Sequence, residues 1–298
     1  MPEPTAFRSG MVALVGRPNV GKSTLMNAIL GEKVSIVSRR PQTTRHRLLG
    51  VHTTADHQMV FVDTPGIHQS KKKINQYMVQ AALSALEGVD AVVFVVEALK
   101  WTEGDAAILE RLREVGTPVI AVVNKVDRVA PREKLLPYLE DLQGRFPFAA
   151  LVPLSAERRD NLDPLLDEVV ARLPEGPPLF PEDQITDRSL RFLCAELIRE
   201  QVFHQLGEEV PYATEVQVEH FEEEEGLVRI HANILVEREG QKAIVLGRQG
   251  RRIKAIGTQA RLAIEHLLES RVHLELFVRV REGWTGDDRA LRDLGYEG

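Results

Sequence analysis

Residues 11–29 read MVALVGRPNVGKSTLMNAI, and this stretch decides the fold of the first half of the chain. The apolar run over residues 11–15 predicts a buried strand, and the residues from about Lys22 onward predict a helix. Between them lies G-x-x-x-x-G-K-S, the phosphate-loop pattern in the strand–loop–helix context that it requires. Backbone N–H groups and the positive end of the helix dipole would meet a polyphosphate there. A chance glycine loop is the alternative, and the flanking pattern disfavours it.

The composition is that of a soluble globular protein with two domains. The chain has 298 residues, of which 43% are hydrophobic and 28% are charged. It has no apolar run of about 18 residues and no signal-peptide pattern. The single cysteine, Cys194, excludes an internal disulfide and falls at an apolar helical position, which favours a core residue over a reactive thiol. We therefore expect a cytoplasmic protein. The net charge of −6 gives no hint of nucleic acid, although a sum can hide a local patch.

A second apolar strand ends at Asp63 and is followed at once by Thr64-Pro65-Gly66. A carboxylate at a strand tip beside a phosphate loop suits a water-mediated Mg²⁺ contact, and Gly66 can offer its N–H to a γ-phosphate. Lys22 would reach the β- and γ-phosphates, and the Ser23 hydroxyl would bind Mg²⁺. The predicted phosphate site comprises Gly16, Arg17, Pro18, Asn19, Val20, Gly21, Lys22, Ser23, Thr24, Asp63, Thr64, Pro65, Gly66 and Ile67.

The residues that follow the apolar run over 119–123 read NKVD and predict a guanine selector. The Asp127 carboxylate can accept from both N1–H and the N2 amino group of guanine, whereas adenine lacks these donors. Asn124 would brace the neighbouring loops, and the Ala156 N–H would meet the guanine carbonyl. The alternative is an ordinary polar turn at a strand end. The predicted guanine-binding residues are Asn124, Lys125, Asp127, Ser155 and Ala156.

Strands alternate with helical stretches in this half, so we predict an α/β fold: a doubly wound P-loop domain with its site loops at the carboxyl ends of the strands. The motif order resembles that of the translation-factor-like GTPases. Many small GTPases have a water-orienting glutamine where this chain has Ile67. The resemblance therefore implies slow intrinsic hydrolysis. Asn19 resembles the asparagine through which related enzymes coordinate an activating K⁺.

The second half begins after a proline-rich stretch, which we interpret as a linker over residues 176–186 between domains 1–175 and 187–298. A helix is expected over 187–206, with Asp187 as its N-cap. Alternating residues predict strands over 214–219, 227–236 and 272–280. The run of four glutamates at 222–225 is better explained as an exposed acidic hairpin turn than as a metal site.

The stretch GRQGRRIK, residues 247–254, predicts an RNA contact. It places G-x-x-G between two helical stretches, and such a loop lets a nucleic-acid backbone approach while an adjacent apolar groove receives about four unpaired bases. Six Lys or Arg and no acidic residue lie in 240–264, although residues 187–298 hold 16 basic and 21 acidic residues. A plain glycine turn is the alternative. The predicted RNA-binding residues are Gly247, Arg248, Gln249, Gly250, Arg251, Arg252 and Lys254.

Taken together, GRPNVGKST, QTTRHR, DTPGIH, NKVD, the GRQG loop and the C-terminal residues from Trp284 to Tyr296 resemble the bacterial Era GTPases over nearly the whole chain. The resemblance implies a smaller α+β type II KH domain after the GTPase domain. It also implies binding to the 3′ end of 16S ribosomal RNA and a role in maturing the 30S subunit. Peripheral association with the cytoplasmic face of the inner membrane is a further implication, and we expect a monomer.

For catalysis, the resemblance implies roles for Lys22, Thr44, Asp63 and Gly66, with Ser23 and Thr44 as Mg²⁺ ligands. Thr44 is preferred to Thr43 because related switch loops place the ligand just before the arginine. Two other functions stay open. One is a constitutive RNA-binding module with a structural nucleotide domain, which the intact NKVD and DTPG disfavour. The other is a P-loop kinase, which would not need the guanine selector.

Overall fold

The computed structural model describes residues 6–38, 40, 43–66, 73–207 and 210–296. By its internal contacts the chain divides into two compact units. The first contains residues 1–34, 44–70 and 78–187. The second contains residues 35–43, 71–77 and 188–298, so two short segments from the first half of the sequence belong to the second unit.

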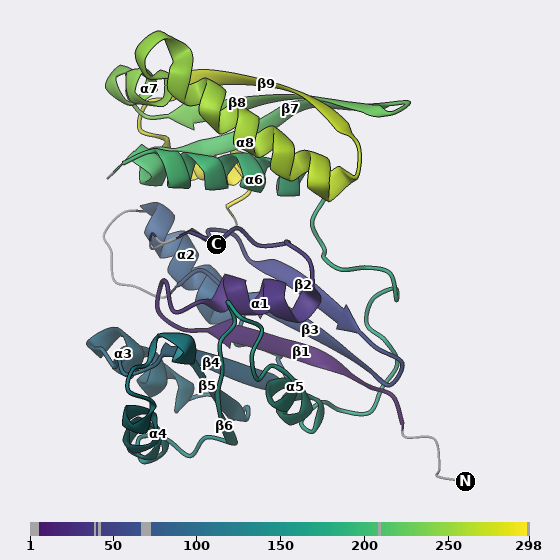
Figure 1. Cartoon of the computed structure of the whole chain (residues 1–298), viewed down its shortest axis with the longest axis vertical. Coiled ribbons are helices and arrows are strands. Elements are labelled where there is room, and N and C mark those ends of the chain that lie inside the picture. Colours follow the sequence, from purple (N-terminus) through teal and green to yellow (C-terminus); the bar gives the residue numbers. More distant parts are fainter. Residues whose placement is uncertain (1–5, 39, 41–42, 67–72, 208–209, 297–298) are drawn as a thin grey trace. The chain divides into compact units, whose positions relative to one another are not determined.

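The first unit is built on a six-stranded sheet with the order β2-β3-β1-β4-β5-β6 (Figure 1). All neighbouring strands are parallel except β2 and β3. Strands β4 and β5 are continuous apolar runs and are buried along nearly their whole length, as expected for parallel strands covered on both faces. The strands are β1 Arg8–Val15, β2 Leu48–Thr53, β3 His57–Asp63, β4 Ala91–Glu97, β5 Val119–Asn124 and β6 Ala150–Pro153.

Helices follow the strands and cover the sheet. Alternate residues of β1 and β4, such as Val15 and Phe94, pack with Ile108 of α3 and Leu142 of α4 in one core cluster. The helices are α1 Lys22–Leu30, α2 Lys73–Ser84, α3 Glu103–Leu112, α4 Leu135–Gln143 and α5 Asp163–Val170. This arrangement is the predicted doubly wound P-loop fold, and the predicted site loops after β1, β3, β5 and β6 lie at the carboxyl ends of those strands. The Thr44 segment instead precedes β2, which runs antiparallel to β3.

Two features of this unit differ from the sequence-based predictions. Strand β2 was not predicted. The stretch we interpreted as a linker, 176–186, is hydrogen-bonded to this unit: the Gln58 side chain bonds the main chain of Leu179 and Phe180, and Thr186 Oγ1 donates to the Leu49 carbonyl over 2.7 Å. Prolines remove donors but leave carbonyls and the remaining N–H groups available for such contacts.

The second unit has a three-stranded sheet, in which β8 pairs antiparallel with β7 and parallel with β9. Its core joins the apolar faces of α6 and α8 to the sheet. The order α-β-β-α-α-β is the one expected from the sequence (Figure 1). The elements are α6 Leu190–Gln205, β7 Glu215–Glu224, β8 Leu227–Val236, α7 Glu239–Leu246, α8 Arg251–Leu268, β9 Arg271–Val280 and α9 Asp288–Asp293.

Local details of this unit also differ from expectation. Helix α6 is capped by Ser189, whose Oγ accepts from the Phe192 N–H over 3.3 Å, whereas Asp187 accepts from the Leu49 N–H in the first unit. Strand β7 continues to Glu224, so only the last of the four glutamates lies in the turn. Cys194 is buried in the core, and burial raises the pKa of its thiol to about 12. Among the residues that the structure describes, no helix is long and apolar enough to cross a membrane.

Candidate functional site

The phosphate loop connects β1 to the first turn of α1. Gly21, the residue before the helix, has φ 104°, and a Cβ there would lie 2.2 Å from Asn124 Nδ2. Only glycine combines this backbone conformation with that approach. Asn124 in turn donates from Nδ2 to the Val20 carbonyl over 2.9 Å. Asn124, a residue of the predicted guanine selector, therefore braces the phosphate loop.

Lys22 is buried beneath this loop. Its Nζ donates to the carbonyl oxygens of Gly16 and Arg17, over 2.9 and 3.2 Å. Burial lowers the pKa of Lys22 to about 8, against an opposing contribution from the Asp63 carboxylate. A cation that is so poorly solvated would gain much from an anion placed above the loop. Lys22 is thus positioned as the predicted phosphate ligand.

The lowered pKa predicts a pH dependence of nucleotide binding. A bound polyphosphate favours the charged amine, so above pH 8 binding must take up a proton, and affinity should fall by up to about tenfold per pH unit. The free energy of unfolding of the nucleotide-free protein changes with pH in the opposite direction. The unfolded chain binds more protons between pH 8 and 10.5, the ordinary pKa of a lysine, so unfolding becomes less favourable as pH rises through that window.

Calorimetry of GDP binding at pH 7 and pH 9, in buffers with different ionisation enthalpies, measures this proton uptake. We expect uptake at pH 9 and almost none at pH 7. The variant Lys22→Arg keeps its charge throughout and should show neither the uptake nor the fall in affinity. Equal uptake by wild type and Lys22→Arg at pH 9 would exclude Lys22 as the source.

Three oxygen-bearing side chains meet beside Lys22. Ser23 Oγ lies 2.9 Å from Thr44 Oγ1 and donates to Asp63 Oδ2 over 2.8 Å. Two hydroxyls and a carboxylate form a hard oxygen donor set, which fits Mg²⁺. The Thr43 hydroxyl instead donates to the Arg40 carbonyl over 3.0 Å. The geometry therefore favours Thr44 over Thr43 as the metal ligand.

The segment after β3 packs closely against the phosphate loop. Thr64 Oγ1 donates to the Leu14 carbonyl over 2.8 Å, so this side chain supports the loop and does not face a ligand. A Cβ on Gly66 would lie 2.7 Å from the Pro18 nitrogen, which explains why glycine is required there. Pro65 is buried. The predicted contact of Ile67 lies outside the described residues.

On the guanine side, Asn124 connects three segments. Besides its bond to Val20, its Oδ1 accepts from the N–H groups of Lys125 and Ala156, over 2.7 and 3.0 Å. Asn124 therefore braces the neighbouring loops as predicted. The Ala156 N–H, which we expected to meet the guanine carbonyl, is engaged by Asn124 here. The Asp127 carboxylate accepts from Ser155 Oγ over 2.6 Å.

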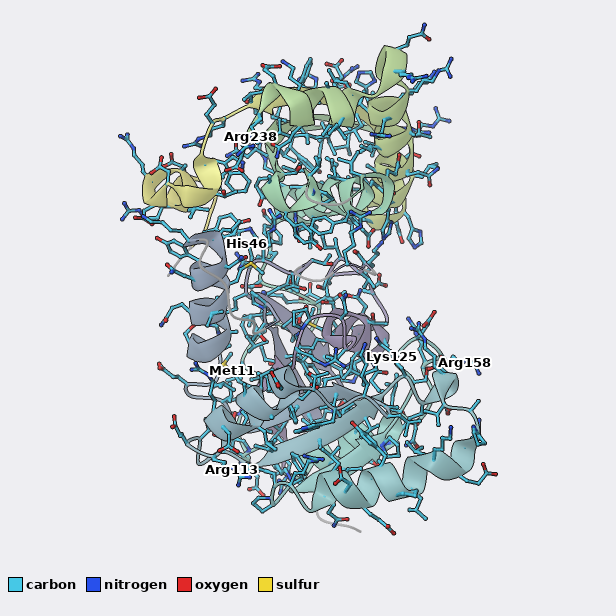
Figure 2. All side chains as sticks on the ribbon, turned by 90° about the vertical axis from the view of Figure 1, so that its left-hand side faces the viewer. Met11, His46, Arg113, Lys125, Arg158 and Arg238 are labelled. Atoms are coloured by element: carbon cyan, nitrogen blue, oxygen red, sulfur yellow. The ribbon has the colours of Figure 1, made fainter. Side chains whose placement is uncertain are left out.

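Lys125 adopts the left-handed conformation, with φ 66°, and its amine extends to the phosphate loop. It donates to the Asn19 carbonyl over 2.6 Å and pairs with Glu97 over 3.0 Å. Lys125 and Arg158, from the loops after β5 and β6, lie on the same side of this unit (Figure 2). The base and phosphate ends of the site are thus linked by this lysine.

One predicted phosphate residue has a structural role. The Arg17 guanidinium pairs with the fully buried Asp105 of α3, with Nε 2.9 Å from Oδ2. Arg17 Nη2 also lies 3.6 Å from Glu97. The Arg17 side chain is therefore committed to a buried ion pair, and only its main chain remains for a phosphate. The partners are 88 residues apart, so local sequence patterns do not predict the pair.

In the second unit, the predicted RNA loop connects α7 to α8. Gly247 has φ 69°, and a Cβ on it would lie 2.7 Å from Arg252 Cβ. Gln249 and Gly250 also have positive φ, so the loop turns sharply. Arg248, Gln249, Arg251 and Lys254 are exposed, as an RNA contact requires. Arg252 is exposed as well, and its Nη1 donates to the Ile244 carbonyl over 2.8 Å at the end of α7.

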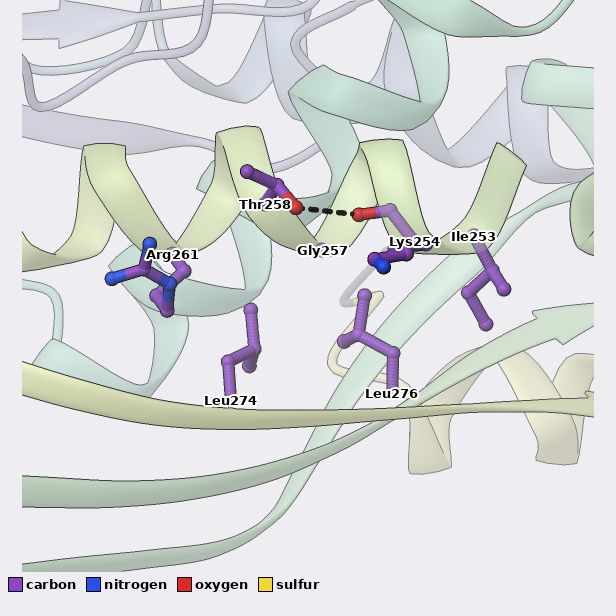
Figure 3. A pocket seen from close by; sticks show the side chains of 7 residues that line it. All are labelled: Ile253, Lys254, Gly257, Thr258, Arg261, Leu274 and Leu276. Carbon is purple, nitrogen blue, oxygen red and sulfur yellow. Dashed lines mark hydrogen bonds between the residues drawn. The ribbon is translucent and has the colours of Figure 1, made fainter. Parts of the chain in front are cut away.

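A groove of about 310 Å³ lies between α8 and β9, beside this loop (Figure 3). The apolar part of its lining comes from Ile253 on the helix and from Leu274 and Leu276 on the strand. Lys254 and Arg261 add positive charge. The lining residues are Ile253, Lys254, Gly257, Thr258, Arg261, Leu274 and Leu276.

This groove agrees with the apolar groove expected beside a G-x-x-G loop. Most of its lining was absent from the predicted RNA-binding residues. The helical part follows an i, i+4, i+8 pattern, Ile253, Gly257 and Arg261, which places the three on one face of α8. This spacing is the feature of the sequence from which the helical part of the groove lining could be predicted. The strand part could not be assigned without knowing that β9 lies beside α8.

Comparison with known proteins agrees with both halves of this description. The family described as 50S ribosome-binding GTPase matches residues 11–125, and the family described as KH domain matches residues 209–285. GTPase Era of Stenotrophomonas maltophilia (strain R551-3) is 54% identical over 298 residues, which span all of both chains. GTPase Era of Pseudomonas aeruginosa (strain LESB58) is 54% identical over 98% of this chain and 96% of that one.

Two solved structures are similar over almost the full length. A crystal structure of Aquifex aeolicus Era bound to GDP and AlF₄⁻ has a TM-score of 0.95 and 39% identity. A crystal structure of Era with MgGDPNP and nucleotides 1506–1542 of 16S ribosomal RNA has the same TM-score and identity. Each match covers 98% of this chain and 100% of the other. With 54% identity to GTPase Era of two organisms over essentially its whole length, the chain belongs to the Era family of GTPases.

Proposed function

We propose that this protein is a GTP-hydrolysing switch that binds the 3′ end of 16S ribosomal RNA and assists assembly and maturation of the 30S subunit. The observation that carries the proposal is the pairing, in one chain, of a guanine nucleotide site with a basic, apolar-walled groove. A relative that is 39% identical was solved with ligands of both kinds, MgGDPNP and 16S ribosomal RNA.

In the nucleotide site, the main chain from Gly16 to Ser23 cradles the phosphates, together with the Lys22 amine. Asp127 accepts the two guanine donors, at the cost of its bond to Ser155. Ser23 and Thr44 hold Mg²⁺, with Asp63 beside them. When bound, this ion neutralises phosphate charge. The proposed phosphate contacts also include Gly66, whose N–H would donate to the γ-phosphate.

Hydrolysis proceeds by in-line attack of water on the γ-phosphorus, and negative charge spreads over the transferred group. Lys22 and the loop N–H groups stabilise that charge, and the N–H groups require little rearrangement because the loop is already braced by Asn124. Ile67 cannot orient water through a polar group. The intrinsic rate is accordingly slow.

We infer an activating potassium ion at Asn19 from the resemblance of this residue to the asparagine through which related GTPases coordinate K⁺. It has φ 65°, and its main chain is fixed by Lys125 through its carbonyl. We expect GTP hydrolysis to be several-fold faster in K⁺ than in Na⁺ at equal ionic strength, and the difference should disappear in Asn19→Ala. Phosphate release in the two salts measures this. Equal wild-type rates in K⁺ and Na⁺ would show that K⁺ does not activate GTP hydrolysis.

The groove between α8 and β9 holds unpaired RNA bases against Ile253, Leu274 and Leu276, and the loop at 247–250 meets the backbone. Lys254 and Arg261 supply the cationic contacts. The protein acts as a monomer. Peripheral association with the cytoplasmic face of the inner membrane is a separate prediction, which flotation with lipid vesicles tests.

The direct test of this function is binding to an RNA of nucleotides 1506–1542, followed by fluorescence anisotropy, with a scrambled RNA of equal composition as control. We expect binding of the natural sequence that is at least about tenfold tighter. Equal affinity for both RNAs would contradict the proposed target. A constitutive RNA-binding module would instead bind the natural RNA while failing to hydrolyse GTP.

A further inference from the structure

Helix α6 buries two charged residues that neither ligand site uses. Arg199 is 0% exposed and Glu200 is 1% exposed. The apolar face of the same helix, with Cys194, Leu197 and Ile198, packs into the core of the second unit. Charged groups are costly to bury unless they are paired and hydrogen-bonded. The groups that Arg199 and Glu200 contact therefore indicate why these two charges are kept on α6.

The partners are main-chain atoms of residues 35–43, a segment of the second unit. Arg199 Nη2 donates to the Thr43 carbonyl over 2.7 Å. Glu200 Oε1 accepts from the Val37 N–H over 2.9 Å. One turn later, His204 Nε2 lies 3.0 Å from the Val37 carbonyl oxygen. Three side chains of one helix thus fix the segment near its start and at its end.

The Arg199 guanidinium is itself rigidly held. Its Nε and Nη2 donate to the two oxygens of Glu196 over 2.7 and 2.6 Å, and Glu215 lies 3.9 Å from Nε. Glu215 also accepts from the Tyr296 hydroxyl. Burial alone would lower the pKa of Arg199, but Glu196 and Glu215 outweigh it and raise the pKa above its ordinary value. Arg199 is therefore a permanently charged donor in a fixed place.

Thr43 is bonded directly to Thr44, whose hydroxyl lies 2.9 Å from Ser23 Oγ in the nucleotide site. The peptide between them is planar, so the held carbonyl and the Thr44 Cα belong to one rigid unit, and only Thr44 φ and χ1 remain between that unit and the Thr44 hydroxyl. We propose that Arg199 and Glu200 are positioning residues for GTP hydrolysis, which place Thr44 by holding the main chain at Val37 and at Thr43. This inference rests on the proposed function, in which Thr44 binds Mg²⁺ beside the γ-phosphate.

The same helix contacts the RNA-binding side of its unit. Ile256, Ala260 and Ile264 of α8 share one core cluster with the apolar face of α6, while the next face of α8 lines the groove. Closely packed helices transmit a shift and do not absorb it. A displacement of α8 by RNA would therefore reach Arg199, and the effect of RNA on hydrolysis should pass through that residue.

The test compares Arg199→Lys with Arg191→Lys, the same change at an exposed arginine of α6. Lysine keeps the charge beside Glu196 but lacks the fork that also reaches Thr43. We expect Arg199→Lys to lower kcat by about tenfold with KM for GTP unchanged within about twofold. The Mg²⁺ concentration needed to bind a non-hydrolysable GTP analogue should rise, while GDP affinity stays as in Arg191→Lys.

Two further changes keep the test decisive if Arg199→Lys is poorly folded. His204→Ala removes an exposed side chain and should lower kcat in the same direction by a smaller factor. Glu200→Gln retains an acceptor for the Val37 N–H and should hydrolyse GTP like wild type, whereas Glu200→Leu should not.

The proposal is overturned if Arg199→Lys and His204→Ala both match Arg191→Lys in kcat. It is also overturned if GDP and the GTP analogue lose affinity equally, since that result indicates a general structural role. Failure of the proposed function looks different, because wild type itself would then neither hydrolyse GTP nor bind the 16S RNA.

Discussion

Replacing Asp127 with asparagine should weaken GTP binding by roughly 10³-fold and create affinity for xanthosine triphosphate. The carboxylate accepts two donors of guanine, whereas an asparagine amide turns an N–H toward them. Xanthine has a carbonyl in place of the amino group, so it accepts that N–H. The Asp127 side chain is only 10% exposed, so water cannot compensate for the mismatch.

Competition against a fluorescent GDP analogue measures both affinities. Asp141→Asn, the same change at an exposed carboxylate of α4 that pairs with Arg145, is the matched control and should bind GTP like wild type. The specificity should invert only at position 127. A variant that loses less than about tenfold in GTP affinity and gains none for xanthosine triphosphate would show that Asp127 does not read the base.

The second large effect is expected in the RNA loop. Gly250→Asp places a carboxylate where the RNA backbone approaches, and we expect it to weaken RNA binding at least about tenfold, more so at low salt. A Cβ at Gly250 meets no atom within 4 Å, so the structural cost of the change is limited to the backbone strain of a side chain at φ 71°, which the control at Gly226 shares. Gly247→Asp should lose RNA binding too, but its Cβ would also press on Arg252.

Gly226→Asp is the matched control, because Gly226 has φ 74° against 71° at Gly250 and equally open surroundings. It adds the same charge in the β7–β8 turn. RNA affinity, GTP hydrolysis and thermal unfolding should be measured on both variants. A loss of RNA affinity that is equal in the two would reflect net charge alone, and would remove the G-x-x-G loop from the RNA site.

Sequence patterns predicted the parts of this protein whose physical demands are local. The phosphate loop, the strand-end Asp63 and the NKVD turn each need particular residues within a few positions, and the structure places them together at one edge of the sheet. The α-β-β-α-α-β order followed from periodicity in the same way. The position of Gly21 is a clear case, because its backbone angle and its neighbour both exclude a side chain.

What the sequence did not predict depends on long-range contacts. The main chain of Arg17 belongs to the predicted phosphate loop, but the pairing of its side chain with Asp105, 88 residues away, has no signal in the local sequence. The proline-rich stretch read as a linker because its composition is that of one, yet Gln58 binds it along β3. Nothing in the pattern of α6 distinguishes the buried Arg199 from the exposed Arg191. Such assignments require the fold.

The central claim is that nucleotide state and RNA affinity are coupled. It is tested most directly by the affinity for an RNA of nucleotides 1506–1542, measured by anisotropy with a non-hydrolysable GTP analogue, with GDP and without nucleotide. We predict the tightest binding with the GTP analogue, and loss of this preference in Arg199→Lys. Equal affinity of the wild type under all three conditions would contradict the switch and leave two independent binding activities in one chain.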